Sequence, residues 1–278
     1  EFPKVATLTE TVESVVKDRP DLSSVDDMTL VQRTRDMMPL FAEIFSAHSE
    51  ASAAASVTMG AITGLALGLG KPGLDLRIAG GLGGVASAAP SFAMWQISRI
   101  VRNSPVLTEE FNAGLIGLEA RLLAVKDTEF NTAFSRLLEL YGSRGPNEWE
   151  LRSQTWETHP ELALTLIDRM RLAEDDQDPQ IRHQEAKERS SIALSELRSM
   201  VSADETSAGT LEIAVTSSSV FIPARENAKT AIVKVVHEVR LAALELGRRL
   251  AEDGRLEHQK HIFMLQDKEL EEAIAGNM

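Results

Sequence analysis

Apolar residues recur along the chain at the three- and four-residue spacing of amphipathic helices, and no stretch alternates long enough to require a strand. Ala, Leu and Glu are frequent, while aromatic residues make up only 5% of the sequence, which favours helix over sheet. The pattern predicts an all-α fold, a multi-helix bundle with long central helices and short irregular connectors. The expected helices cover residues 4–18, 23–68, 91–103, 107–124, 127–140, 159–173, 177–203, 223–251 and 267–277.

Three of these helices begin at residues suited to capping. Ser24 is predicted to be the N-cap of the long second helix, with Asp26 and Asp27 in its first turn, where the helix dipole favours carboxylates. Asp127 and Asp267 are the predicted caps of the helices that follow them. These signals set the expected start of each helix.

Prolines and glycines set the other boundaries. Pro39 is expected to kink the second helix, Pro223 to start the last long helix, and Gly254 to end it. Residues 202–221 allow two interpretations, a loop or a hydroxyl-rich helix packed inside the protein. The apolar run HIFML at 261–265 is expected to be extended.

An uncharged stretch of 20 residues, Ala51 to Gly70, has the length of a bilayer span. Its small residues would drive insertion into lipid only weakly, so we expect a buried helix that packs closely through residues such as Gly60 and Gly64. A membrane helix is the alternative, and detergent dependence during purification would reveal it.

The glycine-rich segment from Gly70 to Pro90 raises the question of a phosphate-binding loop. No Gly-Lys-Ser/Thr follows it and no strand precedes it. A tight loop with a closely packed turn of small residues is therefore the preferred interpretation.

Composition narrows the class of protein. The 278 residues carry a formal net charge of −13 and include no run of five basic residues, which disfavours nucleic acid and anionic membrane as partners. Cysteine is absent, so disulfides and thiolate zinc sites are excluded, and a cytoplasmic location is expected.

A dense polar turn, YGSRGPNEWE at 141–150, interrupts the helical pattern. Arg144 offers a planar fork of donors for a carboxylate or phosphate, and Glu148 follows it across a Gly-Pro turn. One interpretation is a ligand site. The other is an Arg–Glu pair that fixes two helices, with Trp149 as packing.

A second polar cluster lies in PARENAKTAIVK. If Pro223 starts a helix, Arg225 and Lys229 lie one turn apart on one face near its N-terminus, where two cations favour a bound anion. Glu226 would point elsewhere. The alternative is a solvated face with a Glu226–Lys229 pair.

Other catalytic groupings are not evident in the sequence. His258 and His261, next to Glu257, lack a third ligand at a familiar spacing, so a metal site is not expected. The Gly-x-Ser-x-Gly pattern of serine hydrolases does not occur.

With both clusters identified, a resemblance becomes specific. LLELYGSRGPNEWELRSQTWETHPELALTLI resembles the YGhRgPgE…prW.edP signature of the helical middle region in phosphoenolpyruvate-synthase-like phosphotransferases, which include the rifampicin phosphotransferases. The segment from Ala224 to Ile274 is similar to that family's next block, an Arg-Glu-x-x-Lys helix followed by a G.l…DiFfL…EL ending. RIAGGLGGVASAAPSFAMWQISRIVRNSP is similar to the region upstream.

The chain departs from the family pattern at three places. Gln154 and Thr155 replace the usual Pro-Arg before the tryptophan, which removes one cation. His159 stands where an acidic residue is more common. His258, Gln259 and Lys260 replace an acidic group.

The resemblance implies that separate domains carry out separate steps of the reaction. An ATP-grasp domain uses ATP and Mg to phosphorylate a histidine, a mobile histidine domain carries the phosphoryl group, and a helical domain binds the acceptor. Residues 1–278 are expected to be one acceptor-binding domain, with a subdivision into 1–140 and 141–278 as an alternative. The ATP-grasp and phosphohistidine parts are expected on other segments in cis or in trans, so this segment binds no cofactor and is inactive alone.

The resemblance also implies roles for the two clusters. Arg144, Arg225 and Lys229 would converge on the incoming phosphoryl group, and Glu148 or Glu226 would orient the arginines or accept the hydroxyl proton of an alcohol, phenol or drug-like acceptor. Two further residues, Trp149 and Arg152, are expected to contact the acceptor. The competing hypothesis is a helical scaffold or regulatory module that kept the fold and lost the reaction.

Overall fold

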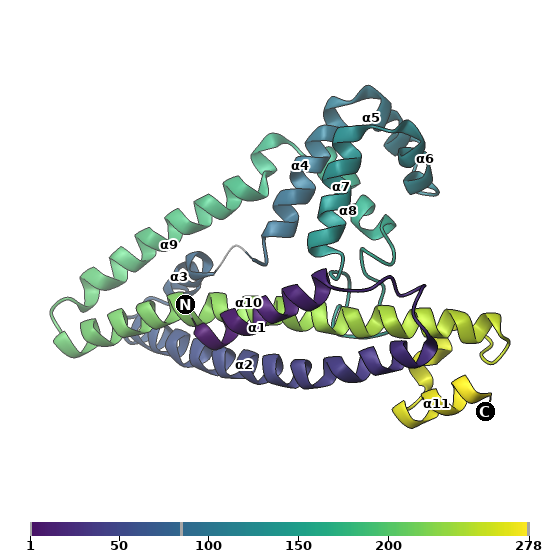
Figure 1. Cartoon of the computed structure of the whole chain (residues 1–278). Helices are drawn as coiled ribbons and strands as arrows, with labels where there is room; N and C mark the ends of the chain where they lie inside the picture. The colour runs from purple at the N-terminus through teal and green to yellow at the C-terminus, as the bar shows by residue number, and fades with distance from the viewer. Residues whose placement is uncertain (1, 84–85, 277–278) are drawn as a thin grey trace. The chain divides into compact units, whose positions relative to one another are not determined.

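The computed structural model describes residues 2–83 and 86–276. These residues form helices joined by short connectors, without a strand, which confirms the predicted all-α fold (Figure 1). The chain divides into two compact units. Unit 1 consists chiefly of residues 48–142 and 156–227, and unit 2 of residues 3–47, 143–155 and 228 onwards.

Unit 1 contains most of the short helices and has two hydrophobic cores. One core joins the second part of α2, α3, α9 and the start of α10 through residues such as Ile62, Ile78 and Leu197. The other joins α4 to α8 around Phe130 and Ile167. The elements that lie wholly in this unit are α3 (Leu74–Leu82), α4 (Ala89–Asn103), α5 (Pro105–Asn112), α6 (Leu118–Val125), α7 (Thr128–Tyr141), α8 (Glu161–Arg171), η1 (Asp175–Gln177) and α9 (Pro179–Val201).

Unit 2 is built around the second half of α10. The first part of α2 packs against it through Leu30 and Val31, which share a core with Leu246 and Leu250. Residues Ile262 and Ala273 from the C-terminal elements complete this core. The elements of this unit are α1 (Pro3–Lys17), part of α2 (Asp27–Gly68), part of α10 (Glu205–Glu252), η2 (Gln259–Met264) and α11 (Asp267–Ala275).

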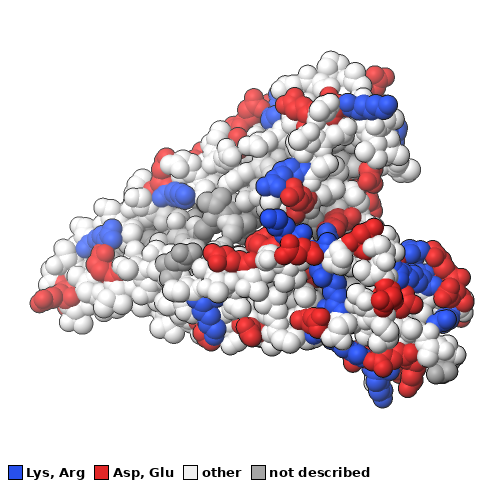
Figure 2. Space-filling model, in the orientation of Figure 1, with Lys and Arg blue, Asp and Glu red and all other residues white. Residues whose placement is uncertain are grey.

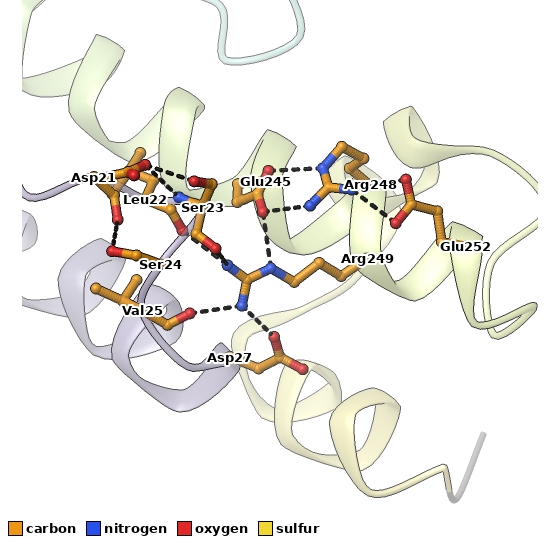
Figure 3. Close-up of polar contacts among 10 residues, drawn as sticks. All are labelled: Asp21, Leu22, Ser23, Ser24, Val25, Asp27, Glu245, Arg248, Arg249 and Glu252. Atoms are coloured by element: carbon orange, nitrogen blue, oxygen red, sulfur yellow. Dashed lines mark hydrogen bonds and ion pairs between the residues drawn. The ribbon is translucent and has the colours of Figure 1, made fainter.

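An arginine on α10 fixes the connector between α1 and α2 (Figure 3). Arg249 donates hydrogen bonds to the carbonyl oxygens of Leu22 at 2.8 Å and Val25 at 2.7 Å. The same guanidinium pairs with Asp27 at 3.0 Å and Glu245 at 2.8 Å. One side chain therefore satisfies several polar groups of the connector and holds it on the helix.

The capping predictions are confirmed at one helix and wrong at two. Asp127 caps α7 by accepting a hydrogen bond from the Phe130 amide at 3.0 Å. The cap of α2 is Asp26, not Ser24, because the Asp26 carboxylate accepts from the Thr29 amide at 2.9 Å. The cap of α11 is Gln266, not Asp267, in a capping box with Glu269.

Two segments differ from their predicted structure. The single helix expected at 107–124 is two helices, α5 and α6, since Gly114 and Gly117 both adopt positive φ between them. The run expected to be extended at 261–265 lies mostly in the 3₁₀ helix η2.

The largest difference concerns the last long helix, which begins at Glu205 rather than at Pro223. Pro223 lies inside α10 even though an interior proline removes a hydrogen bond. The hydroxyl-rich stretch before it is helical, and Thr210 satisfies its hydroxyl by donating to the Thr206 carbonyl at 2.9 Å. The prediction that Arg225 and Lys229 lie at the N-terminus of a helix is therefore wrong.

The uncharged stretch 51–70 lies largely in α2, but its predicted close packing is wrong. An added Cβ at Gly60 or Gly64 would have no neighbour within 4 Å outside its own helix. Only 22% of the most apolar 18-residue window of α2 is buried. By length and composition this helix could cross a bilayer, so the membrane alternative stays open.

The glycine-rich segment contains α3, and one of its glycines makes the expected close contact. A Cβ at Gly81 would lie 2.3 Å from the Cβ of Ser190 on α9. The Ser190 hydroxyl donates to the Ile78 carbonyl at 2.6 Å, so α3 and α9 touch through small residues. Gly84 and Val85 lie outside the described residues.

Charged side chains of both signs are mixed on the face shown in Figure 2. Arginines and lysines on this face lie beside carboxylates, in keeping with pairs such as Lys234–Glu13 at 2.6 Å.

Candidate functional site

The polar turn predicted at 141–150 lies in the connector between α7 and α8, and residues 143–155 of this connector belong to unit 2. From here on the polar turn means residues 143–155. Its path depends on two small or permissive residues. A Cβ at Gly145 would lie 2.4 Å from the Gln154 carbonyl oxygen, and Asn147 adopts the left-handed conformation with φ of 53°. Both positions are costly for most other residues, so the Gly-Pro-Asn sequence is required by the shape of the turn.

The turn places a buried carboxylate between two cations. Glu148 accepts from Arg144 Nε at 2.8 Å through one oxygen and faces Lys229 Nζ at 3.4 Å through the other. The Glu148 side chain is 11% exposed, whereas that of Lys229 is 32% exposed. The carboxylate thus fixes Arg144 and reaches across to α10.

The charges of this trio sum to one positive charge. The Lys229 ammonium has three donors, of which Glu148 takes one at a long distance. The arrangement is therefore suited to holding an additional anion next to Lys229, with Glu148 as the positioning group.

Arg225 and Glu226 belong to unit 1 and form their own ion pair. The imidazole Nδ1 of His48 lies 3.2 Å from the Arg225 carbonyl oxygen, so this end of α10 is also tied to α2. On α10, Arg225 precedes Lys229 by one turn, as predicted. The structure brings together Arg144, Glu148 and Lys229, and it shows Arg225 paired with the neighbouring carboxylate.

Aromatic side chains lie next to the trio in unit 2. Trp149 is 40% exposed and meets Phe45 edge-on at 6.4 Å between ring centroids. Phe45 in turn stacks on Phe41 at 5.7 Å. Because Met38, Phe41 and Phe45 recur at three- and four-residue spacing, they form one apolar face of α2. We call Phe41, Phe45 and Trp149 the aromatic face.

A further arginine, missed in the sequence, holds the turn from inside. Arg240 on α10 is fully buried and donates to the carbonyl oxygens of Glu148 at 3.0 Å, Glu150 at 2.9 Å and Leu151 at 3.1 Å. A fourth hydrogen bond runs to His237 Nδ1 at 3.1 Å. Burial lowers the pKa of Arg240 to about 10, against the raising effect of the nearby Glu150 and Glu148 carboxylates.

Arg240 remains charged at neutral pH and acts as an internal cap for the turn. A sequence signal for it exists, since Ile232, Val236 and Arg240 recur every four residues and the first two are buried. An arginine at that period is predicted to be buried, and a buried arginine requires acceptors.

Arg152, the other predicted contact residue, lies at a pocket of about 570 Å³ in unit 2. The pocket is enclosed by α2, the polar turn, α10 and the C-terminal elements. Arg152 is separate from the trio, because the pocket residues on α10 start at Val239, about 15 Å along the helix from Lys229.

Of the two histidines near the C-terminus, His258 and His261, the first forms a hydrogen bond with the backbone. His258 Nδ1 accepts a hydrogen bond from the Lys260 amide at 3.1 Å and so caps η2. Among the described residues, no group of three or more His, Asp or Glu side chains is placed to hold a metal ion.

The fold is thus a helical domain in which Arg144, Glu148 and Lys229 form an ion-pair network next to exposed aromatic side chains. The sequence model of the rifampicin phosphotransferase fourth domain matches residues 47–226, more than half of the chain. The chain belongs to this family, which confirms the resemblance. The matched range includes Arg144, Glu148 and Arg225 and ends three residues before Lys229. A search of curated proteins found no match.

Proposed function

We propose that this chain is the acceptor-binding part of a phosphotransferase that moves a phosphoryl group from ATP, through a phosphohistidine, to a hydroxyl group of an alcohol, phenol or drug-like acceptor. The observation that carries the proposal is the trio Arg144–Glu148–Lys229 beside the aromatic face, in a chain of this family. The partners are an ATP-grasp domain, which uses ATP and Mg, and a phosphohistidine domain.

Each group of the site has a proposed task. Lys229 and Arg144 attract the phosphoryl oxygens, because phosphoryl transfer depends chiefly on cations and on positioning. Glu148 keeps both cations in place. Trp149 and Phe45 bind the apolar body of the acceptor.

The chemical step exchanges one bond at phosphorus. The acceptor oxygen forms a bond to phosphorus while the phosphorus–nitrogen bond breaks and its electron pair returns to the imidazole. The proton of the acceptor hydroxyl leaves to a carboxylate of the site, for which we propose Glu148.

The test uses the complete system, with the ATP-grasp and phosphohistidine parts added to this chain and a panel of phenols and alcohols followed by mass spectrometry. Lys229→Ala and Arg144→Ala are expected to lower kcat by about 10²- to 10³-fold without loss of helix content, as for removal of one group that stabilises transition-state charge.

Lys234→Ala is the matched control for the lysine. Lys234 lies on the same helix and pairs with Glu13 at 2.6 Å, and it is expected to keep the wild-type rate. Wild-type rates from both the Lys229 and the Arg144 variants would refute the proposed site.

A second candidate function, a scaffold that lost the reaction, is favoured by one observation. Thr155 stands where the resemblance implies an arginine, and it is fully buried in unit 2. The chain therefore lacks one cation that the resemblance implies in this turn. Absence of any phosphorylated product from the complete system, with intact phosphohistidine formation, would support this alternative.

A further inference from the structure

The pocket in unit 2 has the size and the lining of a small-molecule site. Its volume of about 570 Å³ lies in the range that accommodates drug-sized ligands. The wall is largely apolar, with Val31, Val239, Ala243 and Leu246 from the two long helices. Met38, 54% exposed, lies at its edge and can adjust to different ligand shapes.

The polar groups at the pocket are not equivalent. Arg35 is already neutralised, because it pairs with Asp267 at 2.9 Å and Glu271 at 2.7 Å. Glu150 accepts a hydrogen bond from the backbone amide of Arg152 at 3.1 Å and also lies near the buried charge of Arg240. The guanidinium of Arg152 has no hydrogen-bond or ion-pair partner within the described parts of the chain.

We infer that this pocket binds an amphipathic organic anion, a molecule with an apolar body of about ring or short-chain size and one carboxylate, sulfonate or phosphate group. The apolar body packs against the wall formed by α2 and α10, and the anionic group pairs with Arg152. This site is distinct from the trio, and it stands whether or not the chain takes part in phosphoryl transfer.

The backbone around Arg152 is held in a way that suits this task. Arg240 binds the carbonyl oxygens of Glu150 and Leu151, the two residues before Arg152. The side chain of Arg152 therefore projects from a fixed segment, which lowers the entropic cost of binding a ligand.

The experiment compares two fluorescent probes on the isolated 278-residue chain. The probe 1-anilinonaphthalene-8-sulfonate carries an anionic group, whereas N-phenyl-1-naphthylamine has the same body without it. We expect both to bind at one site. Arg152→Gln should weaken binding of the sulfonate about fivefold, as for a partly exposed ion pair, and leave the neutral probe unchanged.

Two further variants make the result decisive. Ala243→Phe fills the pocket from α10 and should abolish binding of both probes, with far-UV circular dichroism as the check on folding. Should that variant unfold, Met38→Trp at the exposed edge replaces it and should weaken both probes. Arg182→Gln, at an exposed arginine of α9 in unit 1, is the control and should change neither.

Two outcomes overturn the inference. If Arg152→Gln weakens both probes equally or neither, the anionic group is not recognised by this arginine. If a folded pocket-filling variant binds both probes as well as the wild type, the probes bind elsewhere. Phosphoryl transfer is not measured in this experiment, so failure here leaves the proposed function to its own test.

Discussion

The positively charged side chain of Arg240 is buried in unit 2 and donates hydrogen bonds to the backbone of the polar turn. A buried charge is tolerated only when its hydrogen-bonding capacity is met, and three carbonyl oxygens and His237 meet it here. The carbonyl groups of the polar turn, for their part, need hydrogen-bond donors where they are buried. At the residue scale, this mutual requirement is what fixes Glu148 opposite Lys229.

Replacing Arg240 should therefore loosen the turn before it affects the helices. Arg240→Met leaves three carbonyl oxygens without donors, and we expect it to lower the free energy of unfolding by about 3 kcal/mol. Trp149 is the only tryptophan of unit 2, so with Trp95 and Trp156 replaced by Phe its fluorescence during urea denaturation reports on this unit. Hydrogen exchange at residues 148–152 gives the local readout.

Arg136→Met serves as the control for Arg240→Met. Arg136 is exposed and pairs only with Glu139 three residues later, so its loss should change stability by less than about 0.5 kcal/mol. Unchanged exchange in the turn of the Arg240 variant would show that other contacts hold the turn.

At the scale of elements, α10 persists through Pro223 because both of its halves are packed. Leu211 and Ala214 lie in a core of unit 1, and Ile232 and Val236 are buried farther along. Burial of these side chains outweighs the local cost of an interior proline, about 3 kcal/mol. Helix boundaries in this chain follow from packing more than from local breakers.

Two glycines on the long helices should respond in opposite ways to alanine. A Cβ at Gly247 of α10 would lie 2.3 Å from the Gln259 carbonyl oxygen, so Gly247→Ala should displace η2 and lower thermal stability. Gly64 of α2 has open space around it, so Gly64→Ala should raise stability by up to about 1 kcal/mol through helix propensity. Thermal denaturation of both variants provides the measurement, and equal shifts would contradict the assignment of η2 to the surface of α10.

Glu245 pairs with Arg249, the arginine that holds the connector before α2, and the stabilisation from this pair should depend on pH. A hydrogen bond from Arg248, followed by one from Arg249, lowers the pKa of Glu245 although burial acts in the opposite direction. Because the pKa in the folded state is below that of the unfolded state, the stabilisation is present above the unfolded value of about 4.3 and is lost as pH falls through the folded value.

Glu245→Gln should therefore destabilise the protein at pH 7 and have a progressively smaller effect below about pH 4. Chemical denaturation at a series of pH values measures this difference. An effect that is constant from pH 7 to pH 3 would mean that the ionised carboxylate is not the source of the stabilisation.

At the scale of the whole molecule, the range matched by the family model nearly coincides with unit 1 plus the polar turn. The matched residues 47–226 span unit 1 together with the polar turn, whereas the other stretches of unit 2 lie almost entirely outside the match. The proposed trio draws on residues inside and outside the match, because Arg144 and Glu148 lie within residues 47–226 and Lys229 does not. The family assignment alone therefore does not define the proposed site.

The sequence by itself determined the helical class, most helix positions and the family. Helical periodicity depends on local spacing, and the YGSRGPNEWE turn depends on residues with narrow backbone preferences, so both can be read along the chain. The pairing of Arg144 with Glu148 could also be predicted from the sequence, since the two residues lie four apart.

Only the tertiary structure decided which side chains meet across the chain. Arg240 reaches the turn from about 90 residues away, and Lys229 reaches Glu148 from 81 residues away. The start of α10 and the open surroundings of Gly60 and Gly64 were likewise decided by packing. Such contacts depend on which buried surfaces face each other in space, and no local pattern encodes that choice.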